Sequence, residues 1–128
     1  MAEEKKTTTS AANILASVSK GTLKLAVPIA DGDRSYDTLT YDFSKLTGWE
    51  MAQALDFGAG KGGPGMNTIT DAQALSLFAT AAAKGGGGLD AVDIRERVSA
   101  RDAIVAIGVA QAFFRASWLE GSSRISNE

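Results

Sequence analysis

Two neighbouring segments with a two-residue apolar period constrain the fold of this chain more than any other feature. TLKLAVPI (22–29) has an apolar side chain at every second position, and TLTYDF (38–43) repeats the period. Such alternation is typical of β-strands, and the Asp31-Gly32 step between the segments predicts a β-hairpin. Because Pro28 has no amide hydrogen, it places the first strand at a sheet edge. A lone hairpin is marginally stable, so its apolar face must pack against helices or another copy of the protein.

Helical patterns follow the predicted hairpin. Thr47 lies three residues before Glu50, and Thr70 lies three residues before Gln73, which is the spacing of a capping box at a helix N-terminus. These and later patterns predict helices at about 47–57, 70–84 and 99–120, with a short helix or turn over 89–98. We therefore predict a mostly helical α+β fold, in which an N-terminal β-hairpin packs with three or four α-helices.

The length of 128 residues suits a single domain. Residues 1–20 are polar and rich in Thr, Ser and Ala, so we expect a flexible N-terminal tail with at most a weak helical turn around Ala12–Val18. The predicted domain spans residues 21–121, with the hairpin at 22–43. We expect residues 122–128 to be a frayed C-terminus.

Composition excludes several function classes. The net charge is -2 and no dense cluster of Lys or Arg occurs, so the electrostatic footprint of a nucleic-acid-binding protein is missing. The chain has no Cys and no His, which removes disulfides, thiol nucleophiles, imidazole bases and the usual zinc ligands. The longest apolar run, at 103–110, is far shorter than the roughly 20 residues of a membrane span. We expect a soluble protein with no membrane or nucleic-acid partner.

The segment FGAGKGGPGMN (57–67) suggests a phosphate-binding loop at first sight. A P-loop requires Gly five residues before the Gly-Lys pair and Ser or Thr after it, between a strand and a helix. Around Gly60-Lys61 these positions are Leu55 and Gly62, and the preceding segment is a predicted helix. We interpret this segment and Gly85–Gly88 as flexible connectors between helices.

Other polar residues also lack the sequence spacing that a metal site or a catalytic site requires. Asp31, Asp33 and Asp37 do not have the spacing of an EF-hand loop, so turn formation explains them better. The serines have no His partner for a nucleophilic triad. A solvated, salt-bridged helix start explains the alternation of Asp93, Glu96 and Asp102 with Arg95, Arg97 and Arg101. We predict no enzymatic activity, no catalytic or metal-binding residue and no cofactor.

The stretch AIVAIGVAQAFF (103–114) is apolar nearly all round the predicted last helix. An ordinary surface helix buries only one stripe. Either this helix is a central core helix wrapped by the others, or part of it faces a partner chain. Small residues at 106, 108 and 110 permit close helix approach in both cases. The candidate residues for partner binding or self-association are Ile104, Ile107, Phe113, Phe114, Trp118 and Leu119.

Taken in order, these segments resemble the tail assembly chaperones of long-tailed bacteriophages. The resemblance rests on the hairpin LKLAVPIADG and TLTYDF, on the following DFSKLTGWEMAQA (42–54), and on the C-terminal half. There FATAAAKGGGGLD (78–90) leads to a charged turn, to Asp102 and to an apolar helix ending near AQAFF. The resemblance covers about residues 22–115. The glycine-rich connectors and the extension through Trp118 depart from the family's pattern.

The resemblance implies a non-enzymatic function. Such chaperones coat the tape measure protein, keep it soluble and help to recruit tail tube subunits, often through a longer frameshifted form. The resemblance also implies a homo-oligomer that works in the host cell cytoplasm and is absent from the mature virion. The alternative interpretation is a small structural tail or head–tail connector subunit of a virion.

Overall fold

A computed structural model describes residues 11–56 and 69–125 and confirms the predicted mostly helical α+β fold. In these residues a two-stranded antiparallel hairpin packs with five α-helices. The elements follow the chain as α2 (Ala11–Val18), β1 (Lys20–Asp31), β2 (Arg34–Asp42), the 3-10 helix η1 (Phe43–Lys45), α3 (Gly48–Asp56), α4 (Asp71–Lys84), α5 (Ala91–Arg97) and α6 (Ala100–Ser122).

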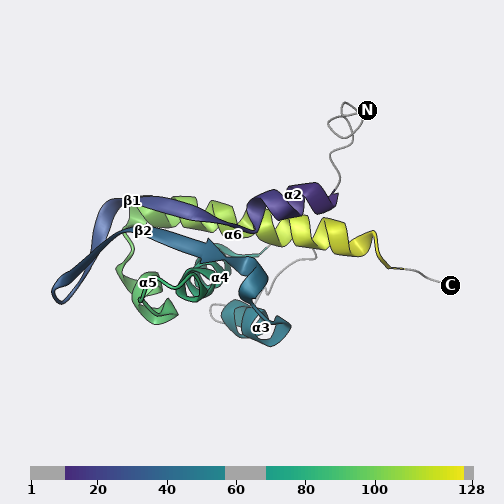
Figure 1. Cartoon of the computed structure of the whole chain (residues 1–128). Coiled ribbons are helices and arrows are strands. Elements are labelled where there is room, and N and C mark those ends of the chain that lie inside the picture. Colours follow the sequence, from purple (N-terminus) through teal and green to yellow (C-terminus); the bar gives the residue numbers. More distant parts are fainter. Residues whose placement is uncertain (1–10, 57–68, 126–128) are drawn as a thin grey trace, which may run out of the picture.

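Helix α6 runs along most of the molecule, and the other elements are arranged around it (Figure 1). The helix α2 and the strand β1 pack along one side of α6, while α4 packs along another. The helix α4 also contacts β2, α3 and α5, so it is the central helix of the fold. The turn of the hairpin projects beyond the helices (Figure 1).

The hairpin forms where the alternating pattern predicts it. Lys20 pairs with Asp42 at its open end, and Asp31 pairs with Arg34 beside the turn. Gly32 has a φ of 63°, which suits the first position of a two-residue hairpin turn. The register shifts between Lys24 and Ile29, so β1 bulges over a stretch that includes Pro28.

One face of the hairpin supplies part of the core. Leu25, Ile29, Leu39 and Phe43 are buried, as the alternation predicts. Val27 was expected on the same face, but it is 46% exposed. That expectation was wrong because the register shift between Lys24 and Ile29 interrupts the strict two-residue period in this stretch.

The predicted helix starts are confirmed by their capping contacts. In the Thr70–Gln73 box the Thr70 amide donates to Gln73 Oε1 at 2.8 Å, and the Gln73 amide donates to Thr70 Oγ1 at 3.2 Å. The Thr47–Glu50 box has the same two bonds at the start of α3. Lys84 at the end of α4 contacts Glu50 at 2.6 Å and lowers the pKa of this carboxyl group, which ties α3 to α4.

Most side chains of α4 between Gln73 and Ala82 are buried, and Leu77 and Phe78 are among the largest of them. The following Gly85 lies against β2. A Cβ atom at Gly85 would lie 1.8 Å from the carbonyl oxygen of Thr40. Only glycine permits this approach, so the Gly85–Gly88 connector packs closely at its first residue.

The N-terminal region differs from the sequence-based expectation. Residues 11–18 belong to α2, which packs against α6 and β1, whereas the sequence predicted a tail to residue 20 with at most a weak turn. A helix of eight residues is unstable alone in water, so its order depends on these tertiary contacts. The expectations for residues 1–10, for the glycine-rich segment 57–67 and for residues 126–128 lie outside the described residues.

Candidate interaction surface

The last helix, α6, supplies the candidate surface. It begins after Ser99, whose hydroxyl accepts a hydrogen bond from the Asp102 amide at 3.2 Å. Its 23 residues extend for roughly 35 Å at the usual helical rise. The buried positions form a stripe of mostly small side chains, namely Asp102, Ala106, Ala110 and Ala116. This stripe lets α6 pack closely on its neighbours and leaves much of its circumference open.

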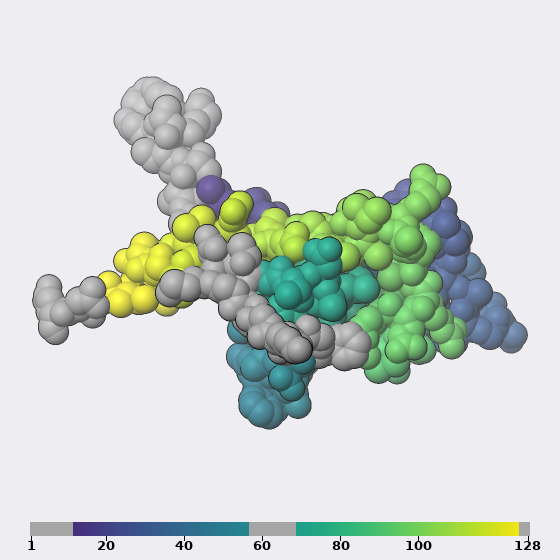
Figure 2. Space-filling view, turned by 180° about the vertical axis from the view of Figure 1, so that it is seen from behind, coloured from purple at the N-terminus to yellow at the C-terminus, as the bar shows by residue number. Residues whose placement is uncertain are grey.

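Exposed residues of α6 recur every three or four positions, so they share one side of the helix. We call this side the outer face of α6 and define it as Arg101, Ile104, Val105, Gly108, Ala112, Arg115 and Leu119. Ile104 is 72% exposed, Leu119 is 51% exposed and Val105 is 48% exposed. Figure 2 shows α6, coloured green to yellow, open to solvent along much of its length. The outer face is therefore an apolar stripe with an arginine towards each end.

The structure separates the six candidate residues of the sequence analysis into two groups. Ile104 and Leu119 lie on the outer face. Ile107, Phe113 and Phe114 are partly buried and pack against the core, and Trp118 is half-buried. The ring of Phe113 stacks on the Phe43 ring, with their centroids 4.3 Å apart and their planes at 8°. Val105, Gly108 and Ala112 also belong to the exposed stripe, although they are not among the six residues predicted for partner binding.

A shallow groove lies between α6 and the end of α2. Its open volume is about 360 Å³, and its lining combines apolar side chains with polar atoms. The lining residues are Ser17, Val18, Tyr41, Val105, Gly108, Val109 and Ala112. Three of these residues, Val105, Gly108 and Ala112, also belong to the outer face. The groove therefore widens the apolar stripe towards α2.

The packing of the described residues does not require glycine at position 108. A Cβ atom at this position would meet no heavy atom within 4 Å. Glycine inside a helix costs about 0.5–1 kcal/mol relative to alanine.

Asp102 anchors α6 to the bulge of β1. Its carboxylate accepts hydrogen bonds from the amides of Ala26 at 2.8 Å and Val27 at 3.1 Å, and from the Ser99 hydroxyl at 2.9 Å. The residue is only 3% exposed. The alternation of acidic and basic residues predicted a solvated, salt-bridged helix start around Asp102. That interpretation was wrong, because the Asp102 carboxylate is buried and binds backbone amides of β1. Ala26 lies 76 positions and Val27 lies 75 positions before Asp102, so a local sequence pattern does not reveal these contacts.

The hydrogen bonds explain the ionisation of Asp102. The bond from the Ala26 amide, followed by those from Val27 and Ser99, lowers the pKa of this carboxyl group below its ordinary value of 3.8. Burial opposes this effect, because it disfavours the charged form, and the nearby Arg101 adds to it. Asp102 is therefore an ionised structural group that holds β1 and α6 together.

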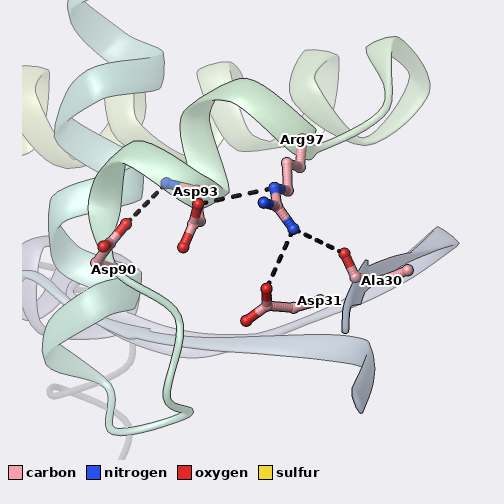
Figure 3. A network of polar contacts seen from close by, with 5 residues as sticks. All are labelled: Ala30, Asp31, Asp90, Asp93 and Arg97. Carbon is pink, nitrogen blue, oxygen red and sulfur yellow. Dashed lines mark hydrogen bonds and ion pairs between the residues drawn. The ribbon is translucent and has the colours of Figure 1, made fainter. Parts of the chain in front are cut away.

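A second polar cluster joins α5 to the hairpin turn (Figure 3). Arg97 Nη1 donates to the carbonyl oxygen of Ala30 at 2.9 Å and lies 3.3 Å from Asp31 Oδ1. Arg97 Nε lies 3.7 Å from Asp93 Oδ1, and Asp90 Oδ1 accepts from the Asp93 amide at 2.8 Å. These carboxylates therefore cap α5 and hold the guanidinium, as expected of a salt-bridged surface.

No group of three or more acidic side chains in residues 11–56 and 69–125 has the arrangement of a metal site. By length and composition, α6 is the one helix of the described ranges that could cross a membrane. The core helix of a soluble protein passes the same test. Here α6 packs against α4, α2 and β1, so its composition alone carries no membrane assignment.

Comparison with known proteins gives no relative: the chain matches no protein-family model, no curated protein and no solved structure.

Proposed function

We propose that this chain is a bacteriophage tail assembly chaperone, a non-enzymatic protein that covers apolar segments of the tape measure protein and keeps them soluble. The proposal starts from the sequence resemblance over residues 22–115. The hairpin, the helix after LTG and the long last helix occur in the order on which that resemblance rests. The proposed site of contact with the client is the outer face of α6.

One observation carries the proposal. On α6, Ile104 is 72% exposed, and it shares a helix face with Val105 and Leu119. Single exposed apolar residues are common, but an aligned set with a groove beside it is typical of a protein-binding surface. The anchoring of α6 through Asp102 and Phe113 holds this surface rigid, which lowers the entropic cost of binding.

The polar clusters support a non-enzymatic function. Asp102 binds backbone amides of β1, and Arg97 binds the hairpin turn. Both groups are engaged in holding elements together. The outer face of α6 takes no part in these internal contacts and is therefore free to bind a partner.

The same proposal includes the further partners that the resemblance implies. Copies of the chain form a homo-oligomer, since neighbouring copies on a long client cover each other's apolar surface. A longer form recruits the tail tube protein. The site of action is the host cell cytoplasm, and the chaperone leaves before the virion is complete.

Co-expression tests the proposal. Fragments of the tape measure protein encoded beside this chain are produced alone, with the wild-type chain, and with an Ile104→Asp/Leu119→Asp variant. We expect the wild type to move the fragments into the soluble fraction and to co-purify with them, and the variant to do neither. Fragments that stay insoluble with the folded wild-type chain would refute the chaperone function.

Purified phage particles separate the proposal from a structural subunit of the tail or of the head–tail connector. We expect quantitative mass spectrometry of the particles to detect no more than traces of this chain. A stoichiometric amount per tail would instead establish the structural subunit.

A further inference from the structure

The outer face of α6 carries positive charge in addition to its apolar stripe. Arg101 and Arg115 are exposed and form no ion pair within the described residues. Asp102 is turned inwards to β1, and Glu120, the next acidic residue of α6, is paired with Arg124 at 2.8 Å. The neighbouring α2 has no charged side chain. Although the chain has a net charge of -2, this surface is therefore locally basic.

The two arginines have a defined spacing. They are separated by 14 positions of one helix, which is roughly 21 Å and nearly four turns, so both project from about the same side. Between them lie Val105, Gly108 and Ala112, which also line the groove. Because Gly108 presents no side chain, a partner backbone can approach α6 most closely midway between the arginines.

We infer that the groove between α6 and α2 binds an amphipathic α-helix whose apolar stripe is flanked by two carboxylates about 14 residues apart. The apolar stripe of that helix lies over Val105, Gly108 and Ala112, and its carboxylates pair with Arg101 and Arg115. Rim ion pairs of this kind select the partner and its register more than they add affinity. The inference rests on the proposed function, since it specifies which helical segments of a client the outer face of α6 accepts.

A peptide pair tests the inference with the full-length chain. Both peptides are helices of about 21 residues with the same alanine and leucine stripe, long enough to span the two arginines. One carries Glu at two positions about 14 residues apart beside the stripe, and the other carries Lys at the same positions. By fluorescence anisotropy at low salt, we expect the Glu peptide to bind the wild-type chain about tenfold more tightly. Equal affinities would overturn the inference.

Charge reversal gives the reciprocal result. The Arg101→Glu/Arg115→Glu variant should prefer the Lys peptide by a similar factor, while the control Arg34→Glu/Lys45→Glu, which changes the net charge equally, should keep the wild-type preference. If the reversed variant melts lower than the wild type, Arg101→Gln/Arg115→Gln replaces it and should bind both peptides alike. A variant that folds and still prefers the Glu peptide would refute the role of the arginines.

Filling the groove tests its location independently of charge. A Cβ atom at Gly108 would meet no heavy atom of the described residues within 4 Å, so we expect the Gly108→Leu variant to fold and to melt close to the wild type. It should nevertheless bind the Glu peptide at least tenfold more weakly, because the leucine occupies the site of closest approach. Unchanged binding by this variant would place the helix elsewhere.

Failure of this inference is distinguishable from failure of the proposed function. If tape measure fragments become soluble with the wild type and equally with the Arg101→Glu/Arg115→Glu variant, the chaperone function stands and the charge-selected helix does not. If the peptides bind as expected and the fragments stay insoluble, the helix-binding groove stands and the chaperone function is refuted.

Discussion

Among individual residues, Asp102 has the most demanding environment. It is 3% exposed, and its carboxylate receives two backbone amides and a hydroxyl. These donors lower its pKa, so its contribution to stability is fully present above its unfolded-state value near 3.8 and is lost as pH falls through the lower folded-state value. A single carboxylate thus couples the bulge of β1 to the start of α6.

We predict that Asp102→Asn lowers the melting temperature by several degrees at pH 7, because an amide nitrogen then faces a backbone amide. The difference from the wild type should narrow as the pH falls below 3.8, where the wild-type carboxylate also becomes protonated. Thermal denaturation followed by circular dichroism between pH 7 and pH 2.5 measures both effects. Asp33→Asn, in the exposed turn, is the control and should melt like the wild type. A pH-independent difference would contradict the assigned role.

Gly85 gives a second prediction at the residue scale. Because a Cβ atom there would lie 1.8 Å from the Thr40 carbonyl oxygen, Gly85→Ala must displace α4 from β2. We expect a loss of roughly 1–3 kcal/mol in the free energy of unfolding, measured by urea denaturation. Gly87→Ala is the matched control, since nothing lies within 4 Å of its Cβ position. Equal stability of the two variants would show that the connector does not pack as described.

At the scale of elements, helices hold the hairpin at two places, the bulge of β1 and the turn. The bulge of β1 is bound by α6 through Asp102, and the turn is bound by α5 through Arg97 (Figure 3). The Arg97 side chain is 45% exposed, so solvent screens its ion pairs with Asp31 and Asp93. The contacts of Arg97 therefore keep the turn ordered and add little to the global stability of the protein.

Arg97→Gln tests this division. We expect a change of less than about 1 kcal/mol in the free energy of unfolding, because exposed ion pairs contribute little. Amide hydrogen exchange of the turn residues Ala30–Arg34 should nevertheless become faster, since the turn loses its contact with α5. Arg124→Gln, which removes the exposed Glu120 pair, should leave exchange in the turn unchanged. Unaltered exchange in Arg97→Gln would mean that the hairpin orders its own turn.

For the whole molecule, the central fact is that α6 is at once a core helix and a surface helix. Its alanine stripe and the Phe113 ring pack into the fold. Ile104, Val105 and Leu119 remain exposed on the opposite side. In residues 11–56 and 69–125, the hairpin and the four other α-helices leave one side of this long helix uncovered, and that side is the outer face.

Substitutions at two isoleucines of α6 test the stability of the fold and self-association separately. Ile107 is partly buried against the core, so Ile107→Asp should lower the free energy of unfolding by roughly 2–4 kcal/mol. Ile104 is 72% exposed, so Ile104→Asp should leave the melting temperature within a few degrees of the wild type. If copies associate through the outer face, light scattering should show oligomers for the wild type and smaller species for Ile104→Asp. An unchanged oligomer in Ile104→Asp would place self-association elsewhere.

Local sequence signals predicted much of the fold. The alternating segments predicted the hairpin, and the pairs Thr47–Glu50 and Thr70–Gln73 predicted the starts of α3 and α4. These signals succeed because each depends on residues within a few positions of one another. The sequence missed α2 as an ordered helix, because its stability comes from α6, which lies far along the chain.

The candidate surface was only partly predictable. An apolar helix was evident over residues 103–114, and of its selected residues Ile104 and Leu119 do lie on the outer face. Phe113 and Phe114 pack inwards, as Phe113 meets Phe43 from η1. A helix that is apolar nearly all round carries no signal for which side is exposed, because its pattern has no polar stripe.

By itself, therefore, the sequence determined where the strands and most helices begin and end, through alternation, caps and turn residues. Tertiary structure alone decided which side of α6 faces solvent, why Asp102 is buried, and why Gly85 has no side chain. The physical reason is that contacts such as Asp102 with Ala26 join positions 76 residues apart. Packing of the complete chain, and no local preference, sets such contacts.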